Sequence, residues 1–205
     1  NVTSNWGPVE FYNDAEVDIE SQQLGELILY KCSGRVKDTI VNSAIYVINC
    51  ENLKLNNITL KSESPRNYAY YTIIALSENI FIDTLHIRHH LLWLMSYMDI
   101  YRCKDITLKA IFIETGYLGL EVLRSDDVTL KETISKSIQS FTVLVIKNLT
   151  LIDMKINAIS AIRIENLVIK NSTIGTLDIS YSRRIRIADS NLGYLRFIHL
   201  SLIHI

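Results

Sequence analysis

Hydrophobic and polar residues alternate in short segments along most of this chain, and the segments repeat. Each copy of a nine-residue phrase opens with Asn or Asp, continues with an alternating apolar pair, breaks briefly and usually ends with a second pair. Self-similarity at a short fixed period is typical of a solenoid. The clearest copies are NLKLNNITL at Asn52, NIFIDTLHI at Asn79, DITLKAIFI at Asp105, NLTLIDMKI at Asn148 and NLVIKNSTI at Asn166.

Each repeat divides into three short strands, a, b and c, with two inward positions apiece. Alternation at period 2 places one set of side chains inside and the other outside. Leu53 and Leu55 begin one a strand, the b strand follows five residues later, and the step from a c strand to the next a strand is eight residues. The pattern predicts an all-β, right-handed parallel β-helix (solenoid) of about nine three-strand coils with a minimal 18-residue period, since parallel crossovers wind right-handed by default.

The second coil fits this pattern poorly. Arg35 and Lys37 occupy the positions that the repeat assigns to inward apolar residues. We expect the a strand there to be frayed or out of register.

The two ends of the chain differ from the repeat. Residues 1–16 break the pattern and carry Trp6, Phe11 and Tyr12, so we expect them to form an N-terminal cap on a β-helix domain at 17–205. The last residues begin a new a strand, and a bare solenoid end exposes both core and strand edge. We therefore expect a homo-oligomer or end-to-end assembly through the C-terminal coil, or a chain that continues.

Composition limits the partners. With 48% apolar residues and a net charge of −1, the chain has ample core, and nucleic acid or an anionic membrane is not an expected partner. The sequence contains no apolar run that predicts a membrane span. Four Asn-X-Ser/Thr triplets favour an exported, glycosylated surface: Asn1, Asn57, Asn148 and Asn171.

The Asn or Asp that opens each a strand stacks on its counterparts in neighbouring coils. These residue types tolerate left-handed backbone and bond their own turn, and stacked Asn side chains hydrogen-bond along the stack. We therefore expect a structural turn ladder: Asn52, Asn79, Asp105, Asp127, Asn148 and Asn166.

The three cysteines fall at one position of the coil. Cys32 and Cys50 are one 18-residue period apart and should stack directly, at a spacing that a disulfide can bridge. We predict this disulfide, which would suit an oxidising compartment; the alternative is two stacked buried thiols. Ser77 separates Cys103 from Cys50, so Cys103 should not pair.

Extra residues enter four successive coils at one corner, between b and c. Insertions at one edge of a solenoid often form a binding face, and aromatic, His and Arg side chains suit sugar stacking or a protein interface. The alternative is that the apolar run from Leu91 to Met95 folds down as a lid. The predicted patch contains Tyr68, Tyr70, Tyr71, His89, His90, Trp93, Tyr97 and Tyr117.

His86, His89 and His90 form a histidine cluster that could in principle bind a metal. No Cys or acidic residue lies at ligand spacing from them, so we expect no metal site and no cofactor.

Asp99 and Glu121 should face outward one coil apart, with Arg102 and Arg124 three residues after each. Two close carboxylates can split their pKa values and act as acid and nucleophile or base. Carboxylates interleaved with arginines more often form a surface ion-pair ladder.

Segments such as ENLKLNNITL and IENLVIKNSTI resemble the pectin-lyase-like right-handed β-helix superfamily in their pattern, over about residues 17–205. The resemblance implies either a polysaccharide lyase or hydrolase, or a non-catalytic surface protein, spike or adhesin. The acidic and basic clusters of the enzymes are matched only loosely, by Asp99, Glu121, Arg102 and Arg124, and fold alone does not assign function.

We therefore expect a non-enzymatic structural or adhesive module, outside the cell or at its surface, that self-associates end to end in a filament, fibre or spike. The alternative is a carbohydrate-binding or carbohydrate-cleaving protein that uses the insertion patch, with glycans as its partners.

Overall fold

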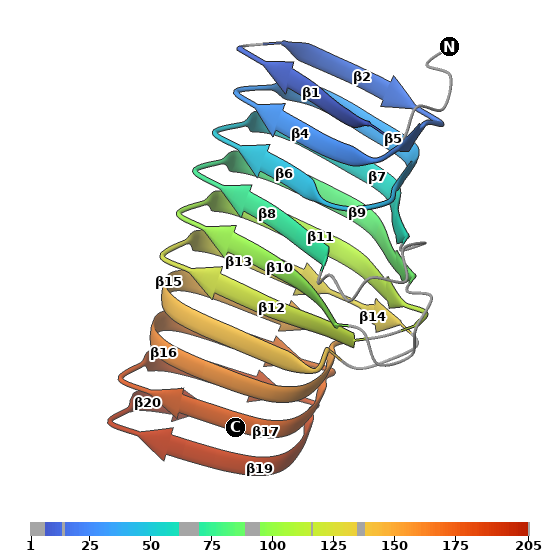
Figure 1. The fold of residues 1–205 in the computed structure, drawn as a ribbon. Helices are drawn as coiled ribbons and strands as arrows, with labels where there is room; N and C mark the ends of the chain where they lie inside the picture. Colours follow the sequence, from blue (N-terminus) through green and yellow to red (C-terminus); the bar gives the residue numbers. More distant parts are fainter. Residues whose placement is uncertain are drawn as a thin grey trace.

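The chain forms a parallel β-solenoid of about nine turns with a spacing of about 19 residues, which confirms the predicted fold class (Figure 1). The structure is a computed structural model that describes residues 7–13, 15–61, 70–88, 95–115, 117–134 and 138–204. The regular elements in this described part are all strands, and the strands pair in parallel with those of the neighbouring coils. The same part contains no helix long and apolar enough to cross a membrane.

The strands form three faces of the solenoid. The a and b sides are formed by β2 (Glu16–Glu20), β3 (Gln23–Leu24), β5 (Ser33–Val41), β7 (Glu51–Lys61), β9 (Glu78–Arg88), β11 (Lys104–Ile113), β13 (Asp126–Lys131), β14 (Thr133–Ile134), β18 (Arg183–Ala188), β20 (Ser201–His204) and the remaining parts of the four long strands that also enter the c sheet. The c sheet is formed by β1 (Pro8–Tyr12), β4 (Glu26–Tyr30), β6 (Ile45–Ile48), β8 (Tyr70–Ala75), β10 (Met95–Tyr101), β12 (Tyr117–Leu123) and parts of β15 (Ser140–Ile152), β16 (Lys155–Lys170), β17 (Thr173–Ser180) and β19 (Asn191–Ile198).

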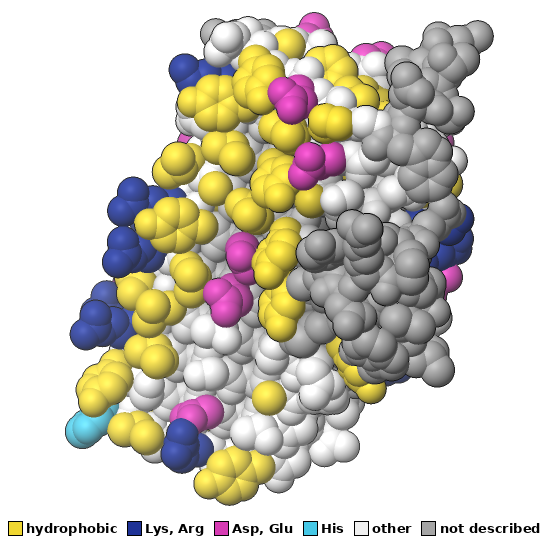
Figure 2. Space-filling view, in the orientation of Figure 1, with side chains coloured by type: hydrophobic (Ala, Val, Ile, Leu, Met, Phe, Trp, Pro, Cys, Tyr) yellow, Lys and Arg dark blue, Asp and Glu magenta, His cyan; other side chains and the backbone are white. Residues whose placement is uncertain are grey.

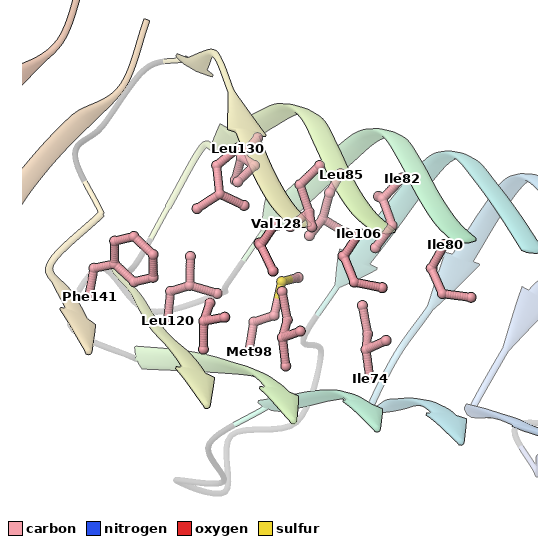
Figure 3. Close-up of a cluster of buried hydrophobic side chains, with 14 of the residues drawn as sticks. Ile74, Ile80, Ile82, Leu85, Met98, Ile106, Leu120, Val128, Leu130 and Phe141 are labelled. Carbon is pink, nitrogen blue, oxygen red and sulfur yellow. The ribbon is translucent and has the colours of Figure 1, made fainter. Parts of the chain in front are cut away.

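The core is a stack of aliphatic layers enclosed by these sheets. In Figure 3, Ile74, Met98, Leu120 and Phe141 of the c sheet point toward side chains of the a and b strands. The predicted inward apolar positions from Leu53 to Ile187 are buried, because alternation leaves only one face of each strand in contact with solvent. From Leu53 onward, one inward a-strand position stays in register through every coil: Leu53, Ile80, Ile106, Val128, Leu149, Leu167, Ile185 and Ile203.

The second coil is out of register with the predicted pattern rather than frayed. Gly34 and Val36 pair with Leu53 and Leu55, so they occupy the inward positions that the sequence pattern assigned to Arg35 and Lys37. Val36 is fully buried, whereas Arg35 and Lys37 point outward and form ion pairs with Asp18 and Glu20. The step from Leu27 to Gly34 is therefore one residue shorter than elsewhere, and the coil that starts at Val17 is shorter than the expected 18-residue minimum.

Part of the expected N-terminal cap belongs to the solenoid. Strand β1 pairs in parallel with β4, with Val9 opposite Leu27 and Phe11 opposite Leu29, so it is the c strand of an earlier coil. Val9 and Phe11 pack against the core as partly buried residues. The solenoid therefore begins before residue 17, and residues 1–6 lie outside the described part.

A column of small polar side chains lines the inside of the corner between c and a. Each Ser hydroxyl or Cys thiol donates to the carbonyl two residues earlier. Four of them, Cys50, Ser77, Ser125 and Ser182, also accept from a backbone N–H of the preceding coil. Ser77 shows both contacts, at 2.8 Å from the oxygen of Ala75 and 3.0 Å from the nitrogen of Cys50. The column runs Cys32, Cys50, Ser77, Cys103, Ser125, then buried Ile146 and Ile164, then Ser182.

This column corrects the predicted disulfide. Cys32 and Cys50 are thiols in the structure, although they are stacked as expected, with the Cys32 N–H 3.4 Å from the Cys50 sulfur. The Cys50 sulfur lies 3.3 Å from the Leu29 carbonyl oxygen and donates to it, so the thiol serves the backbone of the turn. Burial also raises the pKa of the Cys50 and Cys103 thiols, which disfavours the reactive thiolate. The predicted disulfide therefore no longer supports the inference of an oxidising compartment.

Replacing Ser77 tests the column. We expect Ser77→Ala to lower the free energy of unfolding by about 1–3 kcal/mol, because the buried N–H of Cys50 loses its acceptor. Ser77→Cys is the matched control and should be nearly neutral, since thiols fill the same position at Cys50 and Cys103. Urea unfolding followed by circular dichroism measures both; equal losses for the two variants would show that the hydrogen bond is unimportant.

Candidate functional site

The outer face of the c sheet is the strongest candidate for a functional surface. Strand alternation sends every second c-strand residue outward, and the parallel register aligns these residues in rows along the solenoid axis. The middle row contains Glu10, Ile28, Tyr46, Ile73, Asp99, Glu121, Thr142, Ser160, Asp178 and Arg196. The apolar row, two residues later, contains Tyr12, Tyr30, Ile48, Ala75, Tyr101, Leu123, Leu144, Ile162, Ser180 and Ile198.

A third row, the corner row, directly follows the c strands and begins the turn toward the a strands. Its ten residues all have positive φ, near 50–60°, which turns the chain sharply. The row mixes cations with large apolar side chains: Asn13, Lys31, Asn49, Leu76, Arg102, Arg124, Val145, Arg163, Tyr181 and His199.

Large exposed hydrophobic side chains gather on this face and its corner. Figure 2, in which the c sheet faces the viewer, shows hydrophobic side chains running along the solenoid, with Lys and Arg at one edge. Every large hydrophobic residue that is exposed in the described part belongs to a c strand or to the corner row. These residues are Tyr12, Tyr71, Leu76, Tyr117, Val145, Ile162, Tyr181, Tyr194 and Ile198.

The a and b sides of the solenoid carry most of the ion pairs. Most ion pairs of the described residues lie there or at the start of the a strands, for example Arg35 with Asp18 and Lys109 with Asp83. Among the described residues at outward c-strand positions, Arg196 and Asp178 form the one ion pair. The c face therefore differs from the rest of the surface in both apolar content and ion pairing, and an exposed apolar patch of this extent is typical of an interaction site.

The predicted carboxylate pair lies in the middle of this face. Asp99 and Glu121 are directly opposite in the register of β10 and β12, which confirms their expected adjacency. Asp99 is half-buried and Glu121 is exposed. Burial, and secondly the charge of Glu121, raise the pKa of Asp99 above its ordinary value.

The expected ion-pair ladder is not formed by these residues. Among the described residues, neither Asp99 nor Glu121 has a salt bridge. Arg102 instead lies over the ring of Tyr101, 5.1 Å from its centroid, and Arg102 and Arg124 both occupy the corner row. Two acids and two arginines, none of which forms a salt bridge with another described residue, therefore lie on either side of the apolar row in the same two coils.

The raised pKa of Asp99 gives a pH-dependent prediction. A carboxyl whose pKa is higher in the folded state makes folding less favourable as pH rises from its unfolded pKa through its folded pKa. We therefore expect Asp99→Asn to raise stability at neutral pH and to have little effect in acid below both pKa values. Asp178→Asn is the matched control with opposite sign, since the Arg196 hydrogen bond lowers the pKa of Asp178. Urea midpoints at several pH values test this; a stability loss at neutral pH for Asp99→Asn would contradict it.

The predicted insertion patch is partly on this face. Tyr71 and Tyr97 stack with ring centroids 5.8 Å apart, and Tyr117 is exposed at the start of β12. The backbone of Tyr70 lies in β8, but its side chain is not among the described ones. The remaining predicted members, Tyr68, His89, His90 and Trp93, lie outside the described residues, as does most of the alternative lid.

A groove of about 650 Å³ lies at the corner of the last coils. Tyr181 stacks on His199 beside it, with ring centroids 5.1 Å apart, and Glu165 pairs there with Arg183 at 3.0 Å. The groove is continuous with the corner row, because Val145, Arg163, Tyr181 and His199 all line it. It therefore extends the candidate surface around the corner.

The Asn/Asp ladder forms in two hydrogen-bonded parts. Asn79 donates to Asn52 at 2.6 Å, Asn166 donates to Asn148 at 2.6 Å, and Asn148 donates to Asp127. The expected left-handed backbone occurs at Asn52, Asn79, Asp105 and Asp127 but not at Asn148 and Asn166. In those two coils β15 and β16 run through the corner as continuous strands, with Ile146 and Ile164 buried in the polar column.

The glycosylation triplets are placed unequally. Asn57 and Asn171 are both exposed, but the side-chain amide of Asn57 donates to Asp38 at 2.7 Å. The side chain of Asn148 is engaged on both sides by the ladder. Asn1 lies outside the described residues. Asn171 is therefore the triplet best placed to accept a glycan.

His86 has a structural partner rather than ligand neighbours. Its ring stacks on Phe112, with centroids 4.7 Å apart, and its Nδ1 lies 3.2 Å from Glu114. Within the described ranges, no group of three His, Cys, Asp or Glu side chains could hold a metal ion. His89 and His90 lie outside those ranges.

Fold and surface together define the class of this chain: a parallel β-solenoid with one apolar, aromatic outer sheet. No known protein family, curated protein or solved structure matches the chain. The likeness to the pectin-lyase-like superfamily therefore remains an expectation drawn from the residue pattern.

Proposed function

We propose that this chain is a non-catalytic structural or adhesive module that acts outside the cell or at its surface and binds through the outer face of the c sheet. One observation carries the proposal: the large exposed hydrophobic residues of the described part all lie on the c strands or their corner row. Exposed apolar area on a soluble fold is costly unless a partner covers it. The exposed Asn171 triplet supports an exported location.

End-to-end contact through the C-terminal coil is a second part of this proposal. Strands β19 and β20 pair only with β17 and β18 among the described strands, and the inward Leu195 and Phe197 are half-buried. A strand edge of this kind can accept another strand.

Binding experiments with c-face variants test the proposal. The immobilised chain is probed with purified chain, a polysaccharide panel and cell-surface material by biolayer interferometry. We expect at least one of these to bind, and Ile162→Lys with Ile198→Lys to abolish the binding. Arg186→Glu, an exposed charge change on the a strand β18, is the control and should have no effect. No binding at all, or binding that ignores the c-face variant, would refute the proposed surface.

Carbohydrate binding or cleavage is the second candidate, favoured by the stacked Tyr71 and Tyr97 beside Asp99 and Glu121. Aromatic rings stack on sugar faces, and a carboxyl with raised pKa can serve as an acid. Polysaccharide cleavage that is lost in Asp99→Asn would establish this candidate, as a lyase or glycoside hydrolase, and reject the non-catalytic one.

A further inference from the structure

The charges on the outer c face follow a pattern that points to a particular partner. Asp99 and Glu121 lie in the middle row, and Arg102 and Arg124 lie in the corner row of the same two coils. The apolar row runs between them, with Tyr101 and Leu123 at these coils. None of the four charged side chains has a salt bridge within the described part of the chain. The face therefore carries opposite charges on the two sides of an apolar stripe.

We propose that the partner of this face is a second copy of the chain, packed face to face about a two-fold axis parallel to the solenoid axis. This inference rests on the proposed function, because it names the partner of the same surface. A rotation about that axis exchanges the two sides of the stripe and keeps each coil at its own height. Asp99 of one copy then faces Arg102 of the other, Glu121 faces Arg124, and the apolar rows meet between them.

The alternative face-to-face arrangement is disfavoured by charge. A two-fold axis parallel to the strands would keep each row opposite its own kind, so that acids face acids and arginines face arginines. Like charges brought together in an interface oppose binding strongly. The arrangement of charges therefore selects solenoids whose axes are parallel and whose strands run in opposite directions across the contact.

The face is large enough for a stable dimer. Ten c strands at about 4.8 Å spacing give a length of about 45 Å, and three outward rows give a width of about 20 Å. The product, about 900 Å² per copy, is close to the roughly 800 Å² per partner that a standard interface buries. Its aromatic and arginine content, including Arg102 stacked on Tyr101, is typical of the residues that dominate binding energy.

A charge-swap experiment tests the arrangement. One variant carries Arg102→Glu and Arg124→Glu, and the other carries Asp99→Arg and Glu121→Arg. Sedimentation equilibrium of the wild-type chain should give a dimer with a dissociation constant below about 100 µM. Each variant alone should dimerise about 100-fold more weakly or worse, because like charges face each other. An equimolar mixture of the two should recover wild-type affinity as a heterodimer, since both sides become complementary again.

Each outcome decides between the inferences. Recovery of the dimer in the mixture supports a second copy as the partner. Loss of the dimer in Ile162→Lys supports it as well, and this variant serves as the test if an Asp99 variant does not fold. Arg186→Glu on the a sheet is the control and should leave the dimer intact. A wild-type monomer at 100 µM, or a dimer that ignores the c-face charges, overturns the second copy. If such a monomer still binds polysaccharide or cell-surface material through the c face, the proposed function stands without it.

Discussion

Replacing Gly34 by alanine should destabilise the solenoid by about 3 kcal/mol or more. Gly34 has a φ of 111°, a conformation that L side chains rarely adopt, and a β-carbon built there would lie 2.2 Å from the carbonyl oxygen of Val17. The atom that it meets is backbone in the adjacent coil, so no side-chain rotation can relieve the contact. Relief requires separating two paired strands, β2 and β5. Urea unfolding followed by circular dichroism measures the loss.

Gly7→Ala is the matched control for this prediction. A β-carbon at Gly7 would meet no atom within 4 Å, so its effect on stability should stay within about 0.5 kcal/mol. If Gly34→Ala were as stable as Gly7→Ala, the second coil would have to take the register that the sequence pattern predicted, with Arg35 inward.

Phe141→Ala should cost about 3–5 kcal/mol of unfolding free energy. Phe141 is 1% exposed and is among the largest fully buried side chains. It lies between Leu120 and Ile159 in the c-sheet register and spans the core toward the a and b strands (Figure 3). Removing the ring leaves a cavity that the neighbouring coils cannot fill, because hydrogen-bonded ladders on both sides fix their spacing.

Thr142→Ala controls for position in the same strand. Thr142 is the next residue and points outward, so its loss should change stability by less than about 0.5 kcal/mol. A loss below about 1 kcal/mol for Phe141→Ala would mean that the core around β15 collapses onto the vacant space or is not packed as described.

The strand pattern predicted the inward positions from Leu53 onward because alternation and a constant step between strands are both visible in the sequence. It misplaced the second coil because the inward residue there is Gly34, which has no hydrophobic side chain to mark the position. The constant step between strands then assigned the inward position to Arg35. It missed β1 although Val9 and Phe11 precede Val17 and Ile19 by the same eight-residue step. That spacing was the available signal.

The candidate surface was predicted only in fragments. The outward position of Asp99 and its neighbour Glu121 were predicted correctly, because register in a parallel stack follows from coil length. The apolar row was missed because the prediction was limited to one outward position of each c strand, the position of Asp99 and Glu121. The disulfide was wrong because spacing shows that two cysteines stack but does not show that their sulfurs are engaged by the backbone of the turn.

The positive φ of Val145 has a consequence of its own. A β-branched residue in the left-handed region is a conformational outlier that costs of order 1–3 kcal/mol, and Gly or Asn would occupy the same position more cheaply. Leu76 and Tyr181 share this conformation, and all three side chains are exposed. At these three positions a costly backbone conformation coincides with an exposed apolar side chain. Val145→Asn should therefore raise the free energy of unfolding and lower the affinity for a partner of the c face, so that stability and binding change in opposite directions at a single residue.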